Sequence, residues 1–388
     1  MEKNTDSNFP ETTKADWLEQ VRKETKGKDP MELDWQFNER IRLSPLYTPE
    51  EAPARSELPV DTGWQTGSYV GAGHADAVNT RALEELAGGS EALLFNLYHQ
   101  PDLEEMARIL ENIELPYISL HCALYFPDRD PAELFRDLIY YLRHKKYDLA
   151  KIQGSVDFDP LFDWSDPPIK PLIRLLHFVS KRMPGFRVLQ VNGSAFNTGP
   201  ERSDSELALT IAKGAEYLNM LKEGGIPPEI SNHHMQFSLS LGNSYYTNIA
   251  KLRALRILWA NVLKGFGVKD IVLPHVAAHS GLDSLTSDVN GNLLKLTVQA
   301  MSAVSAGADV LFLLPADLPT EKGPTGYGYR MSRNIQQLLK LEAGFNELND
   351  PAAGSHFLDT MTEKLAESAW EQFLEIEKQG GFAEVETI

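Results

Sequence analysis

Cysteine is almost absent from this sequence, since Cys122 is the only one among 388 residues. A single thiol can form no disulfide within the chain and cannot build a thiolate metal cluster. Basic residues are also scarce, because 37 Lys and Arg face 55 Asp and Glu, which gives a net charge of −18. Nucleic acids and anionic membranes are bound by basic surfaces, so we expect neither as a partner.

Long hydrophobic runs are missing as well. The polar N-terminus, residues 1–6, lacks the apolar core of a signal peptide, and the apolar stretch at 310–314 is too short to cross a bilayer. Hydrophobic residues make up 42% of the chain and charged residues 24%, as in ordinary folded proteins. We therefore expect a soluble, cytoplasmic protein.

From about residue 90, apolar stretches alternate with amphipathic ones. The expected strands are 92–98, 117–124, 151–158, 186–192, 234–241, 271–277 and 309–314. The expected helices are 103–112, 131–144, 168–181, 203–218, 249–262, 293–306 and 332–344, the fourth beginning with a capping box from Ser203 to Glu206. This alternation predicts a parallel sheet with right-handed crossovers. Seven strands, with room for an eighth after residue 345, favour an α/β fold of the (β/α)8 TIM-barrel type.

Residues 1–60 differ from the rest and form an expected N-terminal arm, with residues 61–388 making up the barrel and a C-terminal helix. Six prolines break the arm, and one short helix is expected from a capping box that joins Thr13 to Asp16. The arm has isolated apolar residues but no core of its own: Phe9, Trp17, Trp35, Leu43 and Tyr47. They could pack on the barrel or on another subunit, and we favour a subunit contact.

Polar residues gather where the expected strands end, which is where TIM barrels carry their sites. They are Tyr98, His99, Gln100, Asp157, Asp159, Asn192, Ser194, Asn197, Asn243, His275, His279 and Asp317. We expect solvated or hydrogen-bonded rim histidines rather than a metal site at positions 275 and 279. We also favour a turn over a catalytic carboxylate pair at 157 and 159, and a structural role for His233 and His234. These residues name no reaction.

Several motifs, however, resemble the acyl-CoA-binding barrel of methylmalonyl-CoA mutases. They are 64–71, 250–254 with 258–260, 330–336, and 350–357 followed by Leu365, 369–370 and 375–381. Residues 8–10, 16–17 and 45–48 resemble the arm of the small subunit of heterodimeric members. The resemblance implies an isomerase family that uses adenosylcobalamin to interconvert methylmalonyl-CoA and succinyl-CoA, in propionate metabolism.

The family's reacting positions can be located one at a time in this sequence. Tyr69 matches the substrate-side tyrosine, but arginines of the family fall on Gly67 and Thr62, two residues before Tyr69 and Trp64. The family's Tyr-His pair falls on Ser194 and Ala195, and its carboxylate-binding arginine on Lys170. The cobalamin-side histidine falls on Gln100, beside His99. A catalytic imidazole contributes about 10²–10⁴-fold in rate, and Ala195 has no polar atom to replace it.

The resemblance therefore implies the small, non-catalytic subunit of a heterodimer whose larger partner is the catalytic mutase. Trp64, Tyr69, Lys170, Asn192 and Ser194 remain as candidate substrate contacts, and His99 and Gln100 as cobalamin-facing residues. We find no Asp-x-His-x-x-Gly motif, expect no cobalamin domain and no cofactor held by this chain alone, and predict that the chain alone is inactive. Two alternatives stay open: an acyl-CoA barrel that works with a cobalamin protein in trans, and a barrel that binds another ligand.

Overall fold

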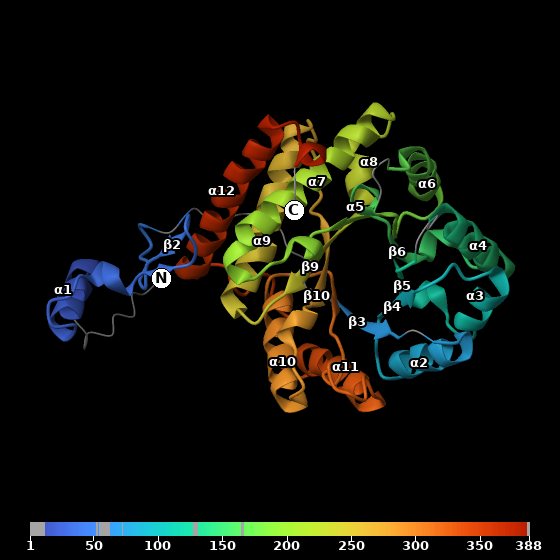
Figure 1. The fold of residues 1–388 in the computed structure, drawn as a ribbon, viewed down its shortest axis with the longest axis horizontal. Coiled ribbons are helices and arrows are strands. Elements are labelled where there is room, and N and C mark those ends of the chain that lie inside the picture. Colours follow the sequence, from blue (N-terminus) through green and yellow to red (C-terminus); the bar gives the residue numbers. More distant parts are fainter. Residues whose placement is uncertain are drawn as a thin grey trace, which may run out of the picture.

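The computed structural model describes residues 12–51, 53, 63–71, 73–126, 131–163 and 167–385. Parallel strands form a closed barrel with helices around it (Figure 1). In order around the barrel these strands are β3 (Gln65–Val70), β4 (Ala92–Leu97), β5 (Ser119–Leu124), β6 (Gln153–Asp157), β7 (Phe186–Arg187) continued by β8 (Leu189–Asn192), β9 (Met235–Leu241), β10 (His275–Ser280) and β11 (Val310–Phe312). One strand is interrupted at Val188, so that β7 pairs with β6 while β8 pairs with β9. The interrupted strand closes a (β/α)8 barrel, as predicted.

The first barrel strand is β3, which the sequence pattern missed. It pairs with both β4 and β11, so the expected eighth strand after residue 345 was wrong. That part of the chain instead forms the long helix α12 (His356–Lys378). The strand escapes detection because four of its six residues, Gln65 to Ser68, are glycine or polar. The strand expected at 92–98 is consequently the second of the barrel.

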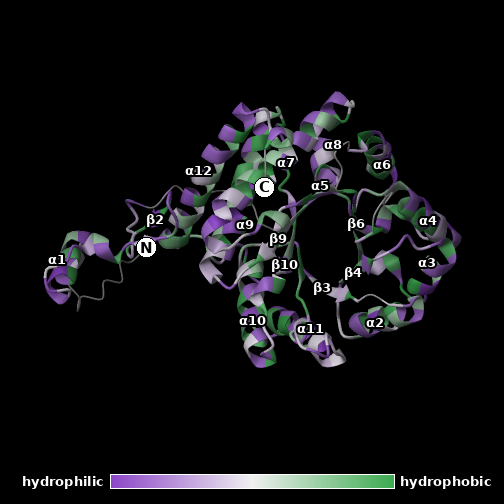
Figure 2. Cartoon of the chain, viewed as in Figure 1, coloured by the Kyte–Doolittle hydropathy of each residue, from purple (hydrophilic) through white to green (hydrophobic). Residues whose placement is uncertain are grey.

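The helices between the strands include all seven expected ones and three that the sequence pattern missed, at 75–87, 160–163 and 228–233. They are α2 (Ala75–Ala87), α3 (Leu103–Ile109), α4 (Pro131–His144), the short α5 (Pro160–Asp163), α6 (Ile169–Arg182), α7 (Ser203–Glu223), the short α8 (Pro228–His233), α9 (Tyr245–Gly265), α10 (Val289–Ser305) and α11 (Gly326–Leu341). Hydrophobic and hydrophilic residues alternate along α4 and α6 in Figure 2, as expected of helices with one buried face. Helix α12 packs against α7 and α9.

The expected capping box at the start of α7 is not formed. The Ser203 hydroxyl donates to the carbonyl of Pro200 instead of accepting from the first turn. Glu206 does not reach back to the helix start either, because its carboxylate binds the ammonium of Lys251. A buried charge on the neighbouring helix thus outcompetes the local cap.

The arm divides into a detached helix and a docked hairpin. Helix α1 (Lys14–Glu24) begins with the predicted capping box between Thr13 and Asp16, has no buried residue and lies apart from the barrel in Figure 1. The hairpin of β1 (Trp35–Gln36) and β2 (Arg42–Leu43) is held to α12, where Lys364 donates to the carbonyl of Arg42 at 2.6 Å.

The apolar residues of the arm accordingly have different surroundings. Leu43 is fully buried in the main core, and the ring of Tyr47 lies 6.4 Å from that of Phe357. These two residues pack on the chain's own barrel, against the favoured subunit contact, whereas Trp35 is 43% exposed. Trp17 belongs to the detached helix, and Phe9 lies outside the described residues.

Two hydrophobic cores stabilise the fold. The larger lies between the sheet and the helices. The smaller lies inside the barrel and consists of Ala92, Leu94, Ala123, Ala277, Val310 and Phe312, with Tyr69 packed against it. Among the described residues, no helix has the length and apolar character that a bilayer-spanning segment requires.

Candidate site inside the barrel

The ring of Phe312 lies at the centre of the apolar half of the barrel interior. Phe312 of β11 is 1% exposed, and its ring centroid lies 5.2 Å from that of His279, 5.4 Å from that of His121 and 5.7 Å from that of Tyr69. The His279 ring is stacked on Phe312, and the His121 ring meets it edge-on. The Tyr69 hydroxyl and His279 Nδ1 are hydrogen-bonded at 2.9 Å. Aromatic side chains from β3, β5, β10 and β11 thus meet in the middle of the barrel.

The glycine at position 67 makes room for this ring. A Cβ atom placed on Gly67 would lie 2.6 Å from Phe312 Cδ1 and 2.6 Å from the carbonyl oxygen of Leu311. Real Cβ atoms do not come so close to a neighbour, so a longer side chain at position 67 would displace Phe312 and press on the backbone of β11. Phe312 therefore occupies the space that a side chain at position 67 would need.

A chain of hydrogen bonds fills the other half of the interior. His121 Nδ1 pairs with the Ser155 hydroxyl at 2.8 Å, and the Gln236 amide donates to the same hydroxyl at 3.3 Å across the barrel. From Gln190 the amide donates to Ser238 at 3.2 Å, and the Ser238 hydroxyl donates to Asn192 Oδ1 at 3.1 Å. These inward-facing side chains bind one another, and Asn192 is the last member of the chain.

Burial controls the ionisation of the interior side chains. Desolvation lowers the pKa of His279 to about 4 and that of His121 well below its usual range, so both imidazoles are neutral near pH 7. Desolvation also raises the pKa of Asp157 to about 7, with repulsion from Asp159 adding to the rise and a hydrogen bond from Gln190 opposing it. Asp157 is therefore the interior group that titrates near neutral pH.

The structure separates the five expected substrate contacts. Tyr69 and Asn192 belong to β3 and β8, four strands apart, so they lie on opposite sides of the interior. Ser194 lies in the 3₁₀ turn Ser194–Phe196 beyond β8, with a buried hydroxyl that has no hydrogen-bond partner among the described residues. Trp64 is at the other end of the barrel, before β3, and Lys170 is exposed in the first turn of α6. Tyr69 and Asn192 therefore belong to the barrel strands, whereas Trp64, Ser194 and Lys170 lie outside them.

The two positions expected to face cobalamin, His99 and Gln100, differ in their contacts. His99 Nε2 binds Glu105 of α3 at 2.8 Å and so engages the outer helical layer. The amide nitrogen of Gln100 is buried without a partner among the described residues, and Ala195 is exposed with no polar side-chain atom. Thr62 lies outside the described residues. Across the described part of the chain, no group of three or more His, Cys, Asp or Glu side chains could hold a metal ion.

Other polar residues at the expected strand ends serve the fold. Asp159 accepts from Lys213 Nζ at 2.6 Å, from the Tyr217 hydroxyl and from the backbone N–H of Asn192 at 2.8 Å, which makes it the centre of a buried ion pair. His275 begins β10 rather than ending it, so its placement at the rim was wrong.

The adjacent His233 and His234 precede β9 and bind backbone carbonyls. His233 pairs with the carbonyl of Pro184 at 2.9 Å and His234 with that of Phe186 at 2.7 Å. A structural role therefore accounts for both, as expected.

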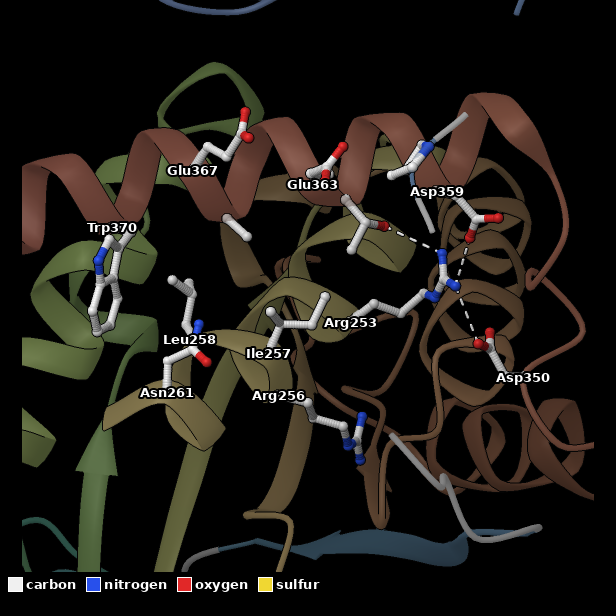
Figure 3. A pocket seen from close by; sticks show the side chains of 13 residues that line it. Arg253, Arg256, Ile257, Leu258, Asn261, Asp350, Asp359, Glu363, Glu367 and Trp370 are labelled. Carbon is white, nitrogen blue, oxygen red and sulfur yellow. Dashed lines mark hydrogen bonds and ion pairs between the residues drawn. The ribbon is translucent and has the colours of Figure 1, made fainter. Parts of the chain in front are cut away.

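The motifs that carry the family resemblance form ion pairs between helices. Arg253 of α9 binds Asp359 of α12 at 2.8 Å and Asp350 at 3.1 Å, lining a groove between α9 and α12 (Figure 3). Lys251 binds Glu206 of α7 at 3.0 Å, with both side chains buried. The motif at 330–336 acts similarly, since Arg333 of α11 binds Glu85 of α2 at 2.9 Å and Gln336 donates to the carbonyl of Gly67 at 3.0 Å.

These features define a TIM-barrel protein with helices joined by buried ion pairs and an interior occupied by its own side chains. The family model "Methylmalonyl-CoA mutase" matches residues 101–387. This chain belongs to the methylmalonyl-CoA mutase family.

Individual relatives agree with that assignment. The chain is 30% identical to the "Methylmalonyl-CoA mutase small subunit" of Porphyromonas gingivalis, over 97% of this chain and 65% of that protein. It is 26% identical to the small subunit of Propionibacterium freudenreichii, over 97% and 63%, and 26% identical to the "Methylmalonyl-CoA mutase large subunit" of Streptomyces virginiae, over 97% and 58%. The chain thus spans less than two thirds of the length of these relatives.

A solved structure of dihydropteroate synthase from Burkholderia cenocepacia, in complex with 7,8-dihydropteroate, is a distant neighbour. It has 11% identity and a TM-score of 0.41, over 74% of this chain and 93% of that one. The barrel described above rests on the strand pairings and not on this likeness.

Sequence reasoning missed Phe312 and its relation to Gly67. Phe312 belongs to an apolar run that is typical of a core strand. In the sequence, Gly67 indicates only that the arginine of the family is replaced. The sequence signal for this contact was a glycine within a strand. Such a glycine often marks the close approach of another group.

Proposed function

We propose that this chain is the small, non-catalytic subunit of an adenosylcobalamin-dependent methylmalonyl-CoA mutase. The observation that carries the proposal is Phe312, whose ring occupies the space beside Gly67 in the middle of the barrel. A thioester arm that followed the barrel axis would need this space. The interconversion of methylmalonyl-CoA and succinyl-CoA is then carried out by the partner subunit.

The positions of the family's reacting groups support the same proposal. At 194 and 195 the chain has Ser194 and an exposed Ala195 in place of a Tyr-His pair. Near Gly67, the loss of a guanidinium removes charge-assisted hydrogen bonds to an anionic substrate, worth roughly 1.5–3 kcal/mol each. Gln100 carries no imidazole, and the neighbouring His99 is bound to Glu105.

A larger partner subunit is supported by the arm and by the relatives. Helix α1 has no buried residue, and isolated helices of fewer than about 12–15 residues are marginal in water. A contact with another subunit would supply the missing packing. Relatives named as small and large subunits are the reason to propose a heterodimer, with residues 1–60 of this chain as its arm and residues 61–388 as its barrel portion.

Adenosylcobalamin belongs, in this proposal, to the complex and not to this chain's barrel. The rim residues do not present an imidazole in the family's position, since Gln100 stands there. An acyl-CoA barrel acting with a cobalamin protein in trans would retain Tyr69, but the tyrosine is tied to His279 and packed against Phe312.

Coexpression with a larger mutase subunit from the same source tests this proposal. We expect a stoichiometric complex on size-exclusion chromatography, and adenosylcobalamin-dependent turnover that persists when Tyr69 of this chain is replaced by phenylalanine. The matched substitution of the corresponding tyrosine in the larger subunit should abolish turnover. Turnover by this chain without a larger subunit, or its loss in the Tyr69→Phe variant of an intact complex, would overturn the proposal.

A further inference from the structure

The barrel contains a second, polar compartment at the N-terminal ends of its strands. This cavity has a volume of about 550 Å³, and its wall includes Trp64, His121, Arg187, His275 and Asp309. His121 lines the cavity and meets the ring of Phe312 edge-on, at 5.4 Å between centroids. Phe312 therefore stands between this cavity and the Tyr69 end of the interior.

Four polar atoms on the wall lack a hydrogen-bond partner among the described residues. They are Trp64 Nε1, His121 Nε2, Arg187 Nε and His275 Nδ1, and each is buried. Trp64 is 4% exposed and His121 is 2% exposed. Buried polar atoms are paired in the great majority of cases, so four unpaired ones around one cavity point to a missing ligand.

Arg187 is a positively charged residue on the cavity wall. Within the described part of the chain, its side chain has no ion pair or hydrogen bond, although burial lowers its pKa and Asp309 partly opposes that effect. Asp309 is itself engaged, because its carboxylate accepts from the Val276 amide at 2.7 Å and from Arg256 at 3.4 Å. The Arg187 side chain is partly exposed on the cavity wall, and an anion in the cavity could accept from its N–H donors.

The other cation at this end is already satisfied. Lys340 Nζ lies 2.6 Å from Glu91 and donates to the carbonyl of Trp64 at 2.9 Å. Arg187 is therefore the charged group of this wall whose hydrogen-bonding capacity is unused among the described residues.

We propose that this cavity binds the carboxylate or phosphate group of a small polar anion. The Arg187 guanidinium would pair with the anion, and the Trp64 indole N–H would donate to it. Guanidinium suits either group, because its planar N–H donors match two oxygens at once. His121 can add a donor: with the Ser155 hydroxyl donating to Nδ1, a neutral ring carries its proton on Nε2, which faces no other partner.

Thermal unfolding of the full chain with inorganic phosphate and, separately, with acetate tests this proposal. Potassium chloride at equal ionic strength is the reference. We expect at least one of the two anions at millimolar concentration to raise Tm by about 2–4 °C, because a ligand that binds only the folded state stabilises it. A response to phosphate alone identifies a phosphate site, and a response to acetate alone identifies a carboxylate site.

Two variants separate the proposed site from general salt effects. Arg187→Met should lose the response to anions, because the guanidinium that would pair with them has been removed. Arg174→Met, at an exposed arginine of α6, should keep the wild-type response. Quenching of wild-type tryptophan fluorescence, lost in Trp64→Phe, provides a second readout if Arg187→Met fails to fold. Equal responses from Arg187→Met and the wild type, or no effect of either anion on wild-type Tm and fluorescence, would overturn the proposal.

Discussion

The helical layer and the barrel interior of this protein use their polar residues in different ways. Between helices, Lys251 is paired with Glu206, and Arg253 with Asp359, in buried contacts that join α9 to its neighbours α7 and α12. Inside the barrel, by contrast, polar side chains bind one another or lie beside a single ring, Phe312. The family motifs at 250–254 and 330–336 lie in the first region, whereas Gly67 and Tyr69 lie in the second.

If the proposed function is correct, fold and chemistry are separated within one family. Ion pairs between helices can stabilise the barrel whatever the chain does. Interior residues are needed in a catalytic form only by a chain that binds the substrate. In the proposed function, Gly67 and Phe312 are compatible with the barrel fold but not with a bound thioester.

The largest expected effect is in the helical layer. Replacing Glu206 by alanine leaves the ammonium of Lys251 buried without its carboxylate partner, which should lower the free energy of unfolding by about 3–5 kcal/mol. Urea denaturation of the single variant measures this loss. The double variant Glu206→Leu/Lys251→Met should recover most of it, because both charges are gone. A single variant as stable as the wild type would show that this pair does not stabilise the fold.

A smaller effect is expected inside the barrel. Gly67→Ala should cost about 1–3 kcal/mol of unfolding free energy, because the added methyl group meets Phe312 and the carbonyl oxygen of Leu311. In a Phe312→Leu background the same substitution should cost less, although not nothing, since the carbonyl oxygen remains. Equal costs in the two backgrounds, measured by urea denaturation, would show that Phe312 does not restrict position 67.

The smallest effect concerns the ionisation of Asp157. Its folded-state pKa of about 7 exceeds the usual 3.8, so the folded protein binds this proton more tightly than the unfolded chain does. The contribution of Asp157 to stability therefore falls as the pH rises from about 4 to about 7. Asp157→Asn should be the more stable protein at pH 8, with a difference in Tm that shrinks towards pH 4. A difference in Tm between the variant and the wild type that does not change with pH would show that burial does not raise the pKa of Asp157.

The fold was largely predictable from the sequence, because apolar strands and amphipathic helices repeat through most of it. The first strand was not, because Gly67 and polar neighbours interrupt the apolar pattern that identifies buried strands. The interactions that begin a helix were harder to predict than the helix itself. The sequence placed Glu206 in a local cap, but its partner Lys251 lies 45 residues away. Long-range ion pairs of this kind leave no periodic signal.

For the candidate site, the sequence predicted only which reactive side chains of the family are missing from this chain. The family resemblance placed Gly67, Ser194 and Ala195 at positions where the family has reactive groups. The sequence did not predict that the Phe312 ring occupies the space beside Gly67. Phe312 lies 245 residues from Gly67 and has the pattern of an ordinary core residue. Compensation between distant positions becomes visible only when the strands are neighbours, as β3 and β11 are.

Titration of the purified chain with methylmalonyl-CoA, compared with adenosine 3′,5′-bisphosphate, tests the central claim most directly. The nucleotide carries the phosphates but lacks the arm that would follow the barrel axis. If Phe312 fills the interior, isothermal titration calorimetry should show that the thioester binds no more tightly than the nucleotide. A thioester that binds ten-fold or more tightly than the nucleotide, with the gain lost on blocking the interior by Ser155→Phe in a folded protein, would contradict the account.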